Sequence, residues 1–269
     1  MDFNVYVDEF EADWRLSGHA PATGRTYGRY IKQLASAVEG PVTLMATKAW
    51  LAESVSAETA RARGRAVRAF GKWAENHDGP DWTWWPQVPL AAVAATPQPT
   101  VTNEDYVAAL RAAPTPRDEL VVELLWCTGM RVGELAALNT VDVNLDDGFA
   151  VVRKSKTGRP RLVPLSDRAC RMIRRRTHAN GQLLGMSAHA IQLMLRRIGA
   201  PSAHAWRRGW AVQALRNGVS QTSVQAAAGW SSGAMVTRYT AAVSAELAIS
   251  EFRRHGPGNS TSADRVRSD

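Results

Sequence analysis

Six side chains in the second half of the chain carry groups that could bind an anion, transfer protons or attack as a nucleophile. An arginine guanidinium is planar, permanently charged and able to bind two phosphate oxygens at once. Lysine and histidine transfer protons, a tyrosine hydroxyl can attack as a nucleophile, and an indole N–H only donates. The six residues are Arg131, Lys156, His204, Arg207, Trp230 and Tyr239.

Taken singly, these residues are ambiguous. Arg131 could be a surface charge or the partner of Glu134, and a lysine at a hairpin tip is usually only solvated. A lone His204 is more often structural, Trp230 would be assigned to the core, and Tyr239 to an exposed amphipathic face. The order in which the motifs occur is therefore what carries information.

The first two motifs are a turn and a hairpin. Arg131 lies in a glycine-bounded turn, T-G-M-R-V-G-E-L over 128–135, which leads into a helix whose amides could share an anion with it. Short β-type runs are expected at 141–145, 149–153 and 161–165, and S-K-T-G over 155–158 forms the predicted turn between the last two. Lys156 at this tip could reach into a bound ligand.

The remaining motifs lie on helices near the end of the chain. His204 and Arg207 are three positions apart and share a helix face, with Trp206 and Trp210 turned toward the core. Trp230 follows a glycine and precedes the helix start predicted at Ser231 and Ser232, and Tyr239 follows near the end of that short helix.

In this order the motifs resemble those of the tyrosine recombinases, the phage integrase family. The catalytic domain of that family carries Arg, Lys, His-x-x-Arg, His or Trp, and Tyr in sequence. Here the slots are filled by T-G-M-R-V-G-E-L, K-S-K-T-G, H-A-W-R, G-W-S-S and R-Y-T. The match spans about half of the chain, and the first part more loosely resembles the family's helical core-binding domain.

The resemblance implies a role for each residue. Tyr239 would attack a DNA phosphodiester to give a 3′-phosphotyrosyl link, while two guanidinium groups stabilise the phosphate. Lys156 would protonate the departing 5′-oxygen, His204 would act beside the tyrosine, and Trp230 would donate to the phosphate. Glu134 would orient Arg131. No metal, ATP or other cofactor is implied, and no Cys/His spacing or carboxylate cluster suggests a metal site.

The chain departs from the family pattern in three ways. Trp206, Arg208 and Trp210 replace smaller or differently polar residues, and Trp230 replaces the commoner histidine. The chain also begins almost at once with the predicted core-binding helices, so we expect no separate arm-binding domain before them.

The elements that must position these residues are mainly helical. We expect a mainly α fold with two domains: a helical core-DNA-binding domain at 1–90, a proline-punctuated linker at 91–101, and a catalytic domain at 102–256 with a small antiparallel β-sheet. Thr102 with Asp105 predicts a helix start. An amphipathic helix is expected near 245–254, and 257–269 reads as a flexible tail.

Charge favours a polyanionic partner. The formal net charge is +8, and residues 96–269 carry 23 Lys and Arg against 14 Asp and Glu, whereas residues 1–95 carry 10 against 11. Two helices of the first domain nevertheless present basic faces, which are either solvated surfaces or tracks for DNA phosphates. These DNA-binding candidates are Arg25, Arg29, Lys32, Arg61, Arg65, Arg68 and Lys72.

The remaining sequence features concern the cellular location of the protein and its partners. Cys127 and Cys170 read as reduced structural thiols, and the acidic start of the chain does not resemble a secretory signal. We expect a protein of the bacterial host cytoplasm, associated with the nucleoid. Its expected partners are double-stranded attachment-site DNA, three further copies in a homotetramer, and accessory bending or directionality proteins.

Several functions remain open at this point. Integration or excision of a phage or mobile element is preferred, with Xer-like resolution of chromosome dimers as the alternative. A type IB topoisomerase would use the same side chains, but the two-domain size and tail helix favour recombination. A regulator that keeps the fold without cutting DNA is argued against by the complete catalytic set.

Overall fold

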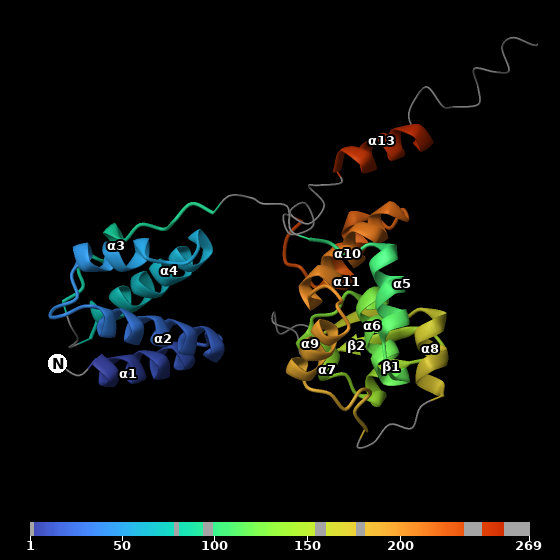
Figure 1. The fold of residues 1–269 in the computed structure, drawn as a ribbon, viewed down its shortest axis with the longest axis horizontal. Coiled ribbons are helices and arrows are strands. Elements are labelled where there is room, and N and C mark those ends of the chain that lie inside the picture. Colours follow the sequence, from blue (N-terminus) through green and yellow to red (C-terminus); the bar gives the residue numbers. More distant parts are fainter. Residues whose placement is uncertain are drawn as a thin grey trace, which may run out of the picture. The chain divides into compact units, whose positions relative to one another are not determined.

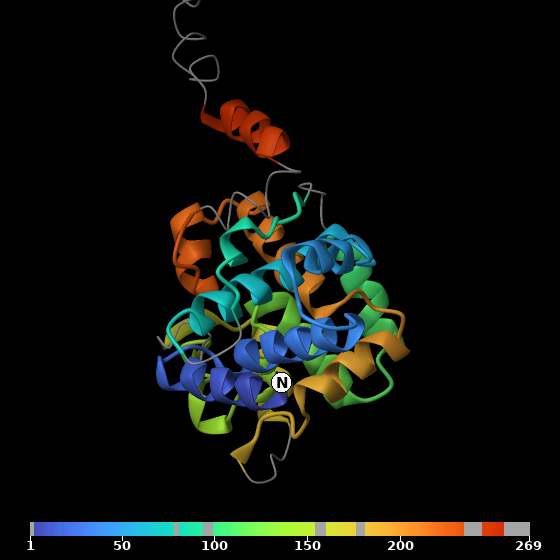
Figure 2. The same cartoon turned by 90° about the vertical axis from the view of Figure 1, so that its left-hand side faces the viewer.

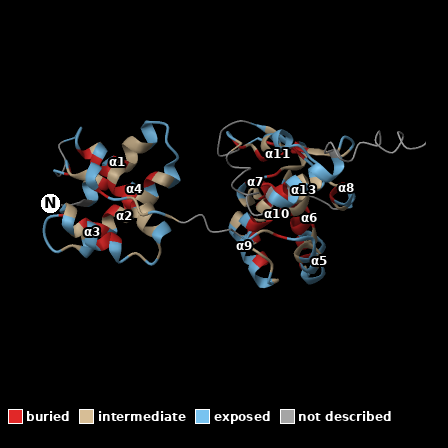
Figure 3. Ribbon diagram, turned by 90° about the horizontal axis from the view of Figure 1, so that it is seen from above, coloured by how far each residue is buried: buried red, intermediate tan, exposed pale blue. Residues whose placement is uncertain are grey.

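The computed structural model describes residues 3–77, 81–93, 99–153, 160–175, 181–233 and 244–255. The chain divides into two compact units, residues 1–96 and 97–269, and the described part is mainly helical with one small sheet. Lys156, Tyr239, the 155–158 turn and the helix predicted to start at Ser231 lie wholly or mostly outside the described residues. In each unit the buried residues gather inside (Figure 3).

The first unit consists of four helices and a short 3-10 turn: α1 (Phe3–Leu16), α2 (Pro21–Ala37), α3 (Leu44–Ala52), α4 (Ala57–Ala74) and η1 (Trp85–Gln87). Thr43 and Ser56 cap α3 and α4 with their side chains, as small hydroxyl residues do at helix starts. Helices α1 and α2 lie side by side (Figures 1 and 2). A Cβ at Gly28 would stand 2.8 Å from Val7 Cγ1, so this close packing requires glycine.

The segment that follows η1 is held to α4. The Arg68 guanidinium donates to the carbonyl oxygens of Val88 (2.9 Å) and Pro86 (3.2 Å), and Arg61 donates to that of Ala91 (3.1 Å). Val88 is fully buried. The start of the predicted 91–101 linker is thus tied to the first unit, and its end is tied to the second, where the Val101 amide donates to the Ala205 carbonyl.

The second unit contains the sheet and most of the helices. Its elements are α5 (Asn103–Ala112), α6 (Pro116–Thr128), α7 (Val132–Ala136), η2 (Thr140–Asp142), β1 (Val143–Asn144), β2 (Phe149–Val152), β3 (Arg161–Pro164), α8 (Asp167–Arg174), α9 (Ala188–Arg197), α10 (Ala203–Arg216), α11 (Gln221–Ala228) and α13 (Ser244–His255). The predicted mainly α fold with a small antiparallel sheet is confirmed. The capping box of Thr102 and Asp105 begins α5 as expected.

The sheet is antiparallel in the order β1-β2-β3, and Val152 pairs with Arg161 at the end of the β2–β3 ladder. The strand expected over 141–145 is reduced to two residues. The Asn139 amide donates to the Asp142 carboxylate at 3.2 Å, which closes the 3-10 turn η2 where the first part of the strand was expected. This side-chain bond competes locally with strand pairing.

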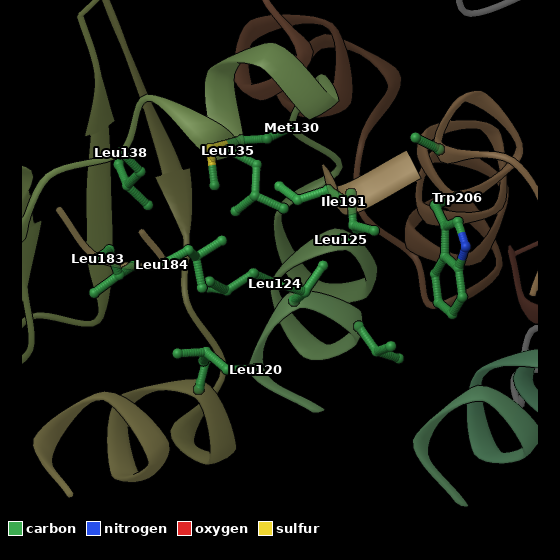
Figure 4. Packing of buried hydrophobic residues seen from close by; sticks show 14 of the residues in the cluster. Leu120, Leu124, Leu125, Met130, Leu135, Leu138, Leu183, Leu184, Ile191 and Trp206 are labelled. Carbon is green, nitrogen blue, oxygen red and sulfur yellow. The ribbon is translucent and has the colours of Figure 1, made fainter. Parts of the chain in front are cut away.

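The core of the second unit forms around α6, which contributes Leu120, Leu124 and Leu125 (Figure 4). Met130 and Leu135 pack on the same cluster, as do Ile191 of α9 and Trp206 of α10. Because these residues come from the elements next to Arg131 and from the helix that carries His204 and Arg207, one rigid core positions these two motifs. Among the described residues, no helix combines the length and apolarity needed to cross a membrane.

Candidate active site

The site begins at the turn that ends α6. Gly129 is in the left-handed conformation (φ 58°), and a Cβ there would lie 2.3 Å from Trp210 Cδ2. Trp210 covers this turn and donates its indole N–H to the Cys127 carbonyl at 3.1 Å. Only glycine allows both the backbone reversal and the tryptophan packing, which together place Arg131 at the start of α7.

Glu134 holds Arg131 at two points. Its carboxylate accepts from the backbone N–H of Arg131 (2.9 Å, Oε2) and from Nη1 of the same residue (2.9 Å, Oε1). The Glu134 side chain is 5% exposed, whereas that of Arg131 is 26% exposed. The Arg131 amide is therefore engaged within the protein, so it is not one of the anion-binding amides expected at this helix start.

A second arginine binds the same carboxylate. Arg161, at the start of β3, donates from Nη1 to Glu134 Oε1 (3.1 Å) and from Nη2 to Oε2 (2.6 Å), and its side chain is 7% exposed. Burial alone would raise the pKa of Glu134, but the hydrogen bonds from Arg161 and Arg131 and the charge of Arg161 together lower it. Glu134 is consequently ionised and bound between two guanidinium groups.

Arg207 is buried and bound by backbone carbonyls. Nη1 donates to the Gly129 carbonyl (2.6 Å) and Nη2 to that of Ala228 (2.5 Å), and the guanidinium lies over the Trp230 ring at 5.1 Å from its centroid. Arg207 thus joins the end of α6 to the end of α11. A carbonyl oxygen carries no formal charge, so neither of these two hydrogen bonds neutralises the guanidinium.

His204 lies in the first turn of α10, one helical turn before Arg207. Partial burial lowers the pKa of His204, and the positive charges of nearby arginines lower it further, in the order Arg208, Arg207, Arg131. The imidazole is therefore kept in its neutral form at neutral pH, in which one ring nitrogen can accept a proton.

These groups face one cleft of about 310 Å³. It is lined by Arg131, Val132, Gly133, Glu134, Ala203, His204 and Arg207. Among the described lining residues, two guanidinium groups against one carboxylate give a net positive charge, and the neutral imidazole adds a proton acceptor. This combination suits an anionic ligand whose reaction needs both charge stabilisation and proton transfer.

Comparison with known proteins gives the family of the chain. Residues 100–246 match the model of the phage integrase family, more than half of the chain. The chain belongs to this family. XerA of Thermococcus kodakarensis is 27% identical over 261 residues, covering 88% of this chain and 90% of the relative. XerC of Mycobacterium tuberculosis is 30% identical over 254 residues, covering 80% and 84%.

Both relatives are named tyrosine recombinases, and the chain is a site-specific DNA recombinase of this class. The fold is shared with lambda integrase. A dimer bound to a COC′ core site matches with a TM-score of 0.72 at 18% identity, covering 87% of this chain and 76% of that chain. A tetramer bound to a Holliday junction matches with 0.71 at 20% identity and the same coverage.

The structure of the recombinase thus brings Arg131, Glu134, His204 and Arg207 together at one cleft. Trp230 lies beside Arg207, packed among Trp210, Val224 and Ala228, rather than among the described residues that line the cleft. Lys156 and Tyr239 lie outside the described residues. Within the described ranges, no three His, Cys, Asp or Glu side chains gather so as to hold a metal ion.

The basic residues of the first unit fall into two groups. Arg25, Arg29 and Lys32 line a groove of about 660 Å³ on α2, although Lys32 also pairs with Asp8 at 3.0 Å. On α4, Arg65 and Lys72 are exposed. Arg61 and Arg68 bind the 86–91 backbone and are partly buried.

Sequence reasoning missed Arg161 and the partnership between Trp210 and Gly129. A signal for Arg161 was present, because alternation in R-L-V-P-L places Arg161 on the same strand face as Val163, which is buried. An arginine on the inward face of a strand requires a buried counter-charge. The packing of Trp210 on Gly129 joins positions far apart in the sequence, which no local pattern reveals.

Proposed function

We propose that this recombinase cleaves DNA through Tyr239 and rejoins it to another strand. The Tyr239 oxygen attacks the scissile phosphorus, the bond to the 5′-oxygen breaks, and a 3′-phosphotyrosyl link forms with a free 5′-hydroxyl. The 5′-hydroxyl of a partner strand then reverses the reaction. Because the covalent link conserves the bond energy, neither ATP nor water is needed.

The observation that carries this proposal is the cleft shared by Arg131, His204 and Arg207. A pentacoordinate phosphorane gains negative charge on its nonbridging oxygens, and two fixed guanidinium groups stabilise it without reorganising. A free phenol has a pKa of about 10, so the attack also requires removal of its proton. Neutral His204 is the acceptor in this proposal, Lys156 donates a proton to the departing 5′-oxygen, and Trp230 donates to the phosphate.

We also propose a role in DNA binding or cleavage for each part of the chain. Residues 1–90 act as the core-DNA-binding domain, 91–101 as the linker and 102–256 as the catalytic domain. The basic groove of α2 and the exposed cations of α4 support contact with the phosphate backbone. The protein would act on nucleoid DNA at double-stranded attachment sites, with bending or directionality proteins as accessory partners.

A homotetramer on DNA is the proposed assembly. Helix α13 exposes Ile249 (57%) and Phe252 (71%), apolar side chains that a neighbouring copy could cover. Lambda integrase, which shares the fold, has been solved as a dimer on a core site and as a tetramer on a Holliday junction. Docking of α13 on a neighbour would couple assembly to cleavage.

The biological role proposed first is integration or excision of a phage or mobile element. The second candidate is Xer-like dimer resolution, favoured by the Xer relatives that match 77–88% of the chain. Covalent trapping on candidate attachment sites and on chromosomal dimer-resolution sites separates the two, because stable adducts form only where the enzyme recognises the core sequence.

The test of the chemistry is a nicked half-site from which the small 5′-hydroxyl fragment diffuses after cleavage. Wild type should accumulate a covalent protein–DNA adduct and Tyr239→Phe should bind the same DNA without forming one. Equal adduct from both variants would remove the nucleophile assignment. DNA binding without any wild-type adduct would support a non-cutting regulator, and relaxation of supercoiled DNA without strand exchange would support a topoisomerase.

A further inference from the structure

Arg161 is a buried arginine outside the six-residue catalytic set. It is 7% exposed and lies outside the lining of the cleft. Its guanidinium binds both oxygens of Glu134, and Nε donates to the Ala227 carbonyl at 2.7 Å. Each of the three nitrogens thus donates within the protein, and Arg161, unlike Arg207, does not line the cleft, so we give it no direct contact with the phosphate.

Arg161 affects the charge balance between Glu134 and Arg131. One carboxylate faces two guanidinium groups, which leaves one positive charge uncancelled. Arg161 makes two hydrogen bonds to Glu134 and is buried, whereas the Arg131 side chain is the more exposed and makes one. Without Arg161, Arg131 would be the one cation paired with this buried carboxylate among the described residues, and the pair would be neutral.

Arg161 also shares a support with Arg207. The two arginines bind adjacent carbonyls at the end of α11, Arg161 that of Ala227 and Arg207 that of Ala228. The next residue, Gly229, has φ 65°, and a Cβ there would lie 2.8 Å from Arg161 Cδ. The chain turn before Trp230 is therefore shaped around Arg161.

We infer that Arg161 is a positioning residue for cleavage: it neutralises Glu134, so that the charge of Arg131 remains available to the scissile phosphate, and it fixes the end of α11 that holds Arg207. This inference rests on the proposed function. The inference also accounts for a charged residue that is buried on a strand. Arg161 and Val152 form the last residue pair of the β2–β3 ladder, next to the segment that contains Lys156.

The test compares two substrates that differ at the scissile position, an ordinary phosphodiester and a methylphosphonate. The methylphosphonate lacks the nonbridging negative charge that Arg131 would stabilise. On the phosphodiester, Arg161→Met should lower the single-turnover rate of adduct formation by about 10- to 100-fold, as expected when the support of a contacting group is lost. On the methylphosphonate its rate should fall only slightly relative to wild type.

Two variants keep the result interpretable. Arg161→Lys retains the charge but not the two-pronged geometry, so it should recover part of the lost rate, and it serves if Arg161→Met does not fold. Arg174→Met removes a surface arginine paired with exposed Asp146 in the same unit and should cleave both substrates like wild type. Equal losses on both substrates, or no loss on the phosphodiester, would overturn the inference.

A readout without cleavage separates this inference from the proposed function. In a crystal structure of Arg161→Met, the Arg131 side chain, which already makes one hydrogen bond to Glu134, should turn further onto this carboxylate and away from the cleft, whereas Arg161→Lys should show a smaller change. An unchanged Arg131 would overturn the inference even if wild type cleaves DNA. If wild type forms no adduct, the proposed function fails, and the position of Arg131 in the variant still decides whether Arg161 controls it.

Discussion

At the residue scale, His204 links electrostatics to chemistry. Its pKa lies below the ordinary 6.5 because its ring is partly buried and arginine charges surround it. Removing the charge of Arg208 by Arg208→Gln should raise the pKa of His204, so the acid limb of the cleavage-rate profile should move to higher pH. Arg208→Lys keeps the charge and should leave the limb in place. NMR titration of the His204 ring measures the pKa directly; an unchanged value in Arg208→Gln would contradict the charge effect.

The same shift has a consequence for stability. Because the folded pKa of His204 is lower than the unfolded value, the unfolded chain takes up the proton first as pH falls. The contribution of His204 to stability is therefore complete above 6.5 and is lost as pH falls toward the folded pKa. Urea unfolding at about pH 7.5 and about pH 5 should show a larger loss for wild type than for His204→Gln, which does not titrate there.

Substitution of Gly129 measures how much the turn before Arg131 contributes to stability. Gly129→Ala should destabilise the fold by about 1–3 kcal/mol for the left-handed backbone and by a further ~1–3 kcal/mol for the clash with Trp210. Gly185 is the matched control, since it has φ 61° and no atom within 4 Å of the place a Cβ would take, so Gly185→Ala should show the backbone cost alone. Equal losses in the two variants, measured by urea unfolding, would argue against the role of Trp210.

At the element scale, Glu123 ties three helices together. Its carboxylate accepts from Tyr106 of α5 (2.5 Å) and from Ser166, the N-cap of α8 (2.6 Å), and Arg168 lies at 3.3 Å. Burial raises the pKa of Tyr106, and the hydrogen bond and charge of Glu123 raise it further. Tyr106→Phe should cost about 1–3 kcal/mol, because the buried carboxylate loses a donor.

A double-mutant cycle checks this assignment. In the Glu123→Gln background, Tyr106→Phe should cost measurably less free energy of unfolding than in wild type, since the charged acceptor is gone. Additive losses would show that the two residues stabilise the fold independently.

Elements with a repeating apolar pattern could be predicted from sequence, and contacts between distant elements could not. The capping box of α5 and the helix that carries His204 and Arg207 follow from local signals, and both predictions are confirmed. The strand start at 141 was wrong because the bond from Asn139 to Asp142 favours a 3-10 turn. The site motifs could be found from their order, but the carbonyls that hold Arg207 come from residues 78 and 21 positions away.

At the scale of the whole molecule, the basic residues of the first unit have two distinct tasks. The guanidinium groups of Arg61 and Arg68 bind the 86–91 backbone, whereas Arg65 and Lys72 on the same helix are exposed. Arg65→Ala with Lys72→Ala should therefore weaken binding to all DNA sequences and reduce the slope of log affinity against log salt by about 2. The unfolding midpoint should stay unchanged, because surface substitutions rarely alter stability.

Arg68→Ala is the matched variant, and it should lower stability instead of DNA affinity. It removes one positive charge from α4 but also the hydrogen bonds that hold Val88 and Pro86, so the free energy of unfolding of the first unit should fall by about 1–3 kcal/mol. Salt-dependent DNA binding and urea unfolding, measured on wild type and both variants, distinguish the tasks. If Arg68→Ala changed the salt slope without loss of stability, its guanidinium would have to leave the 86–91 backbone for DNA, and the division between the two pairs would be wrong.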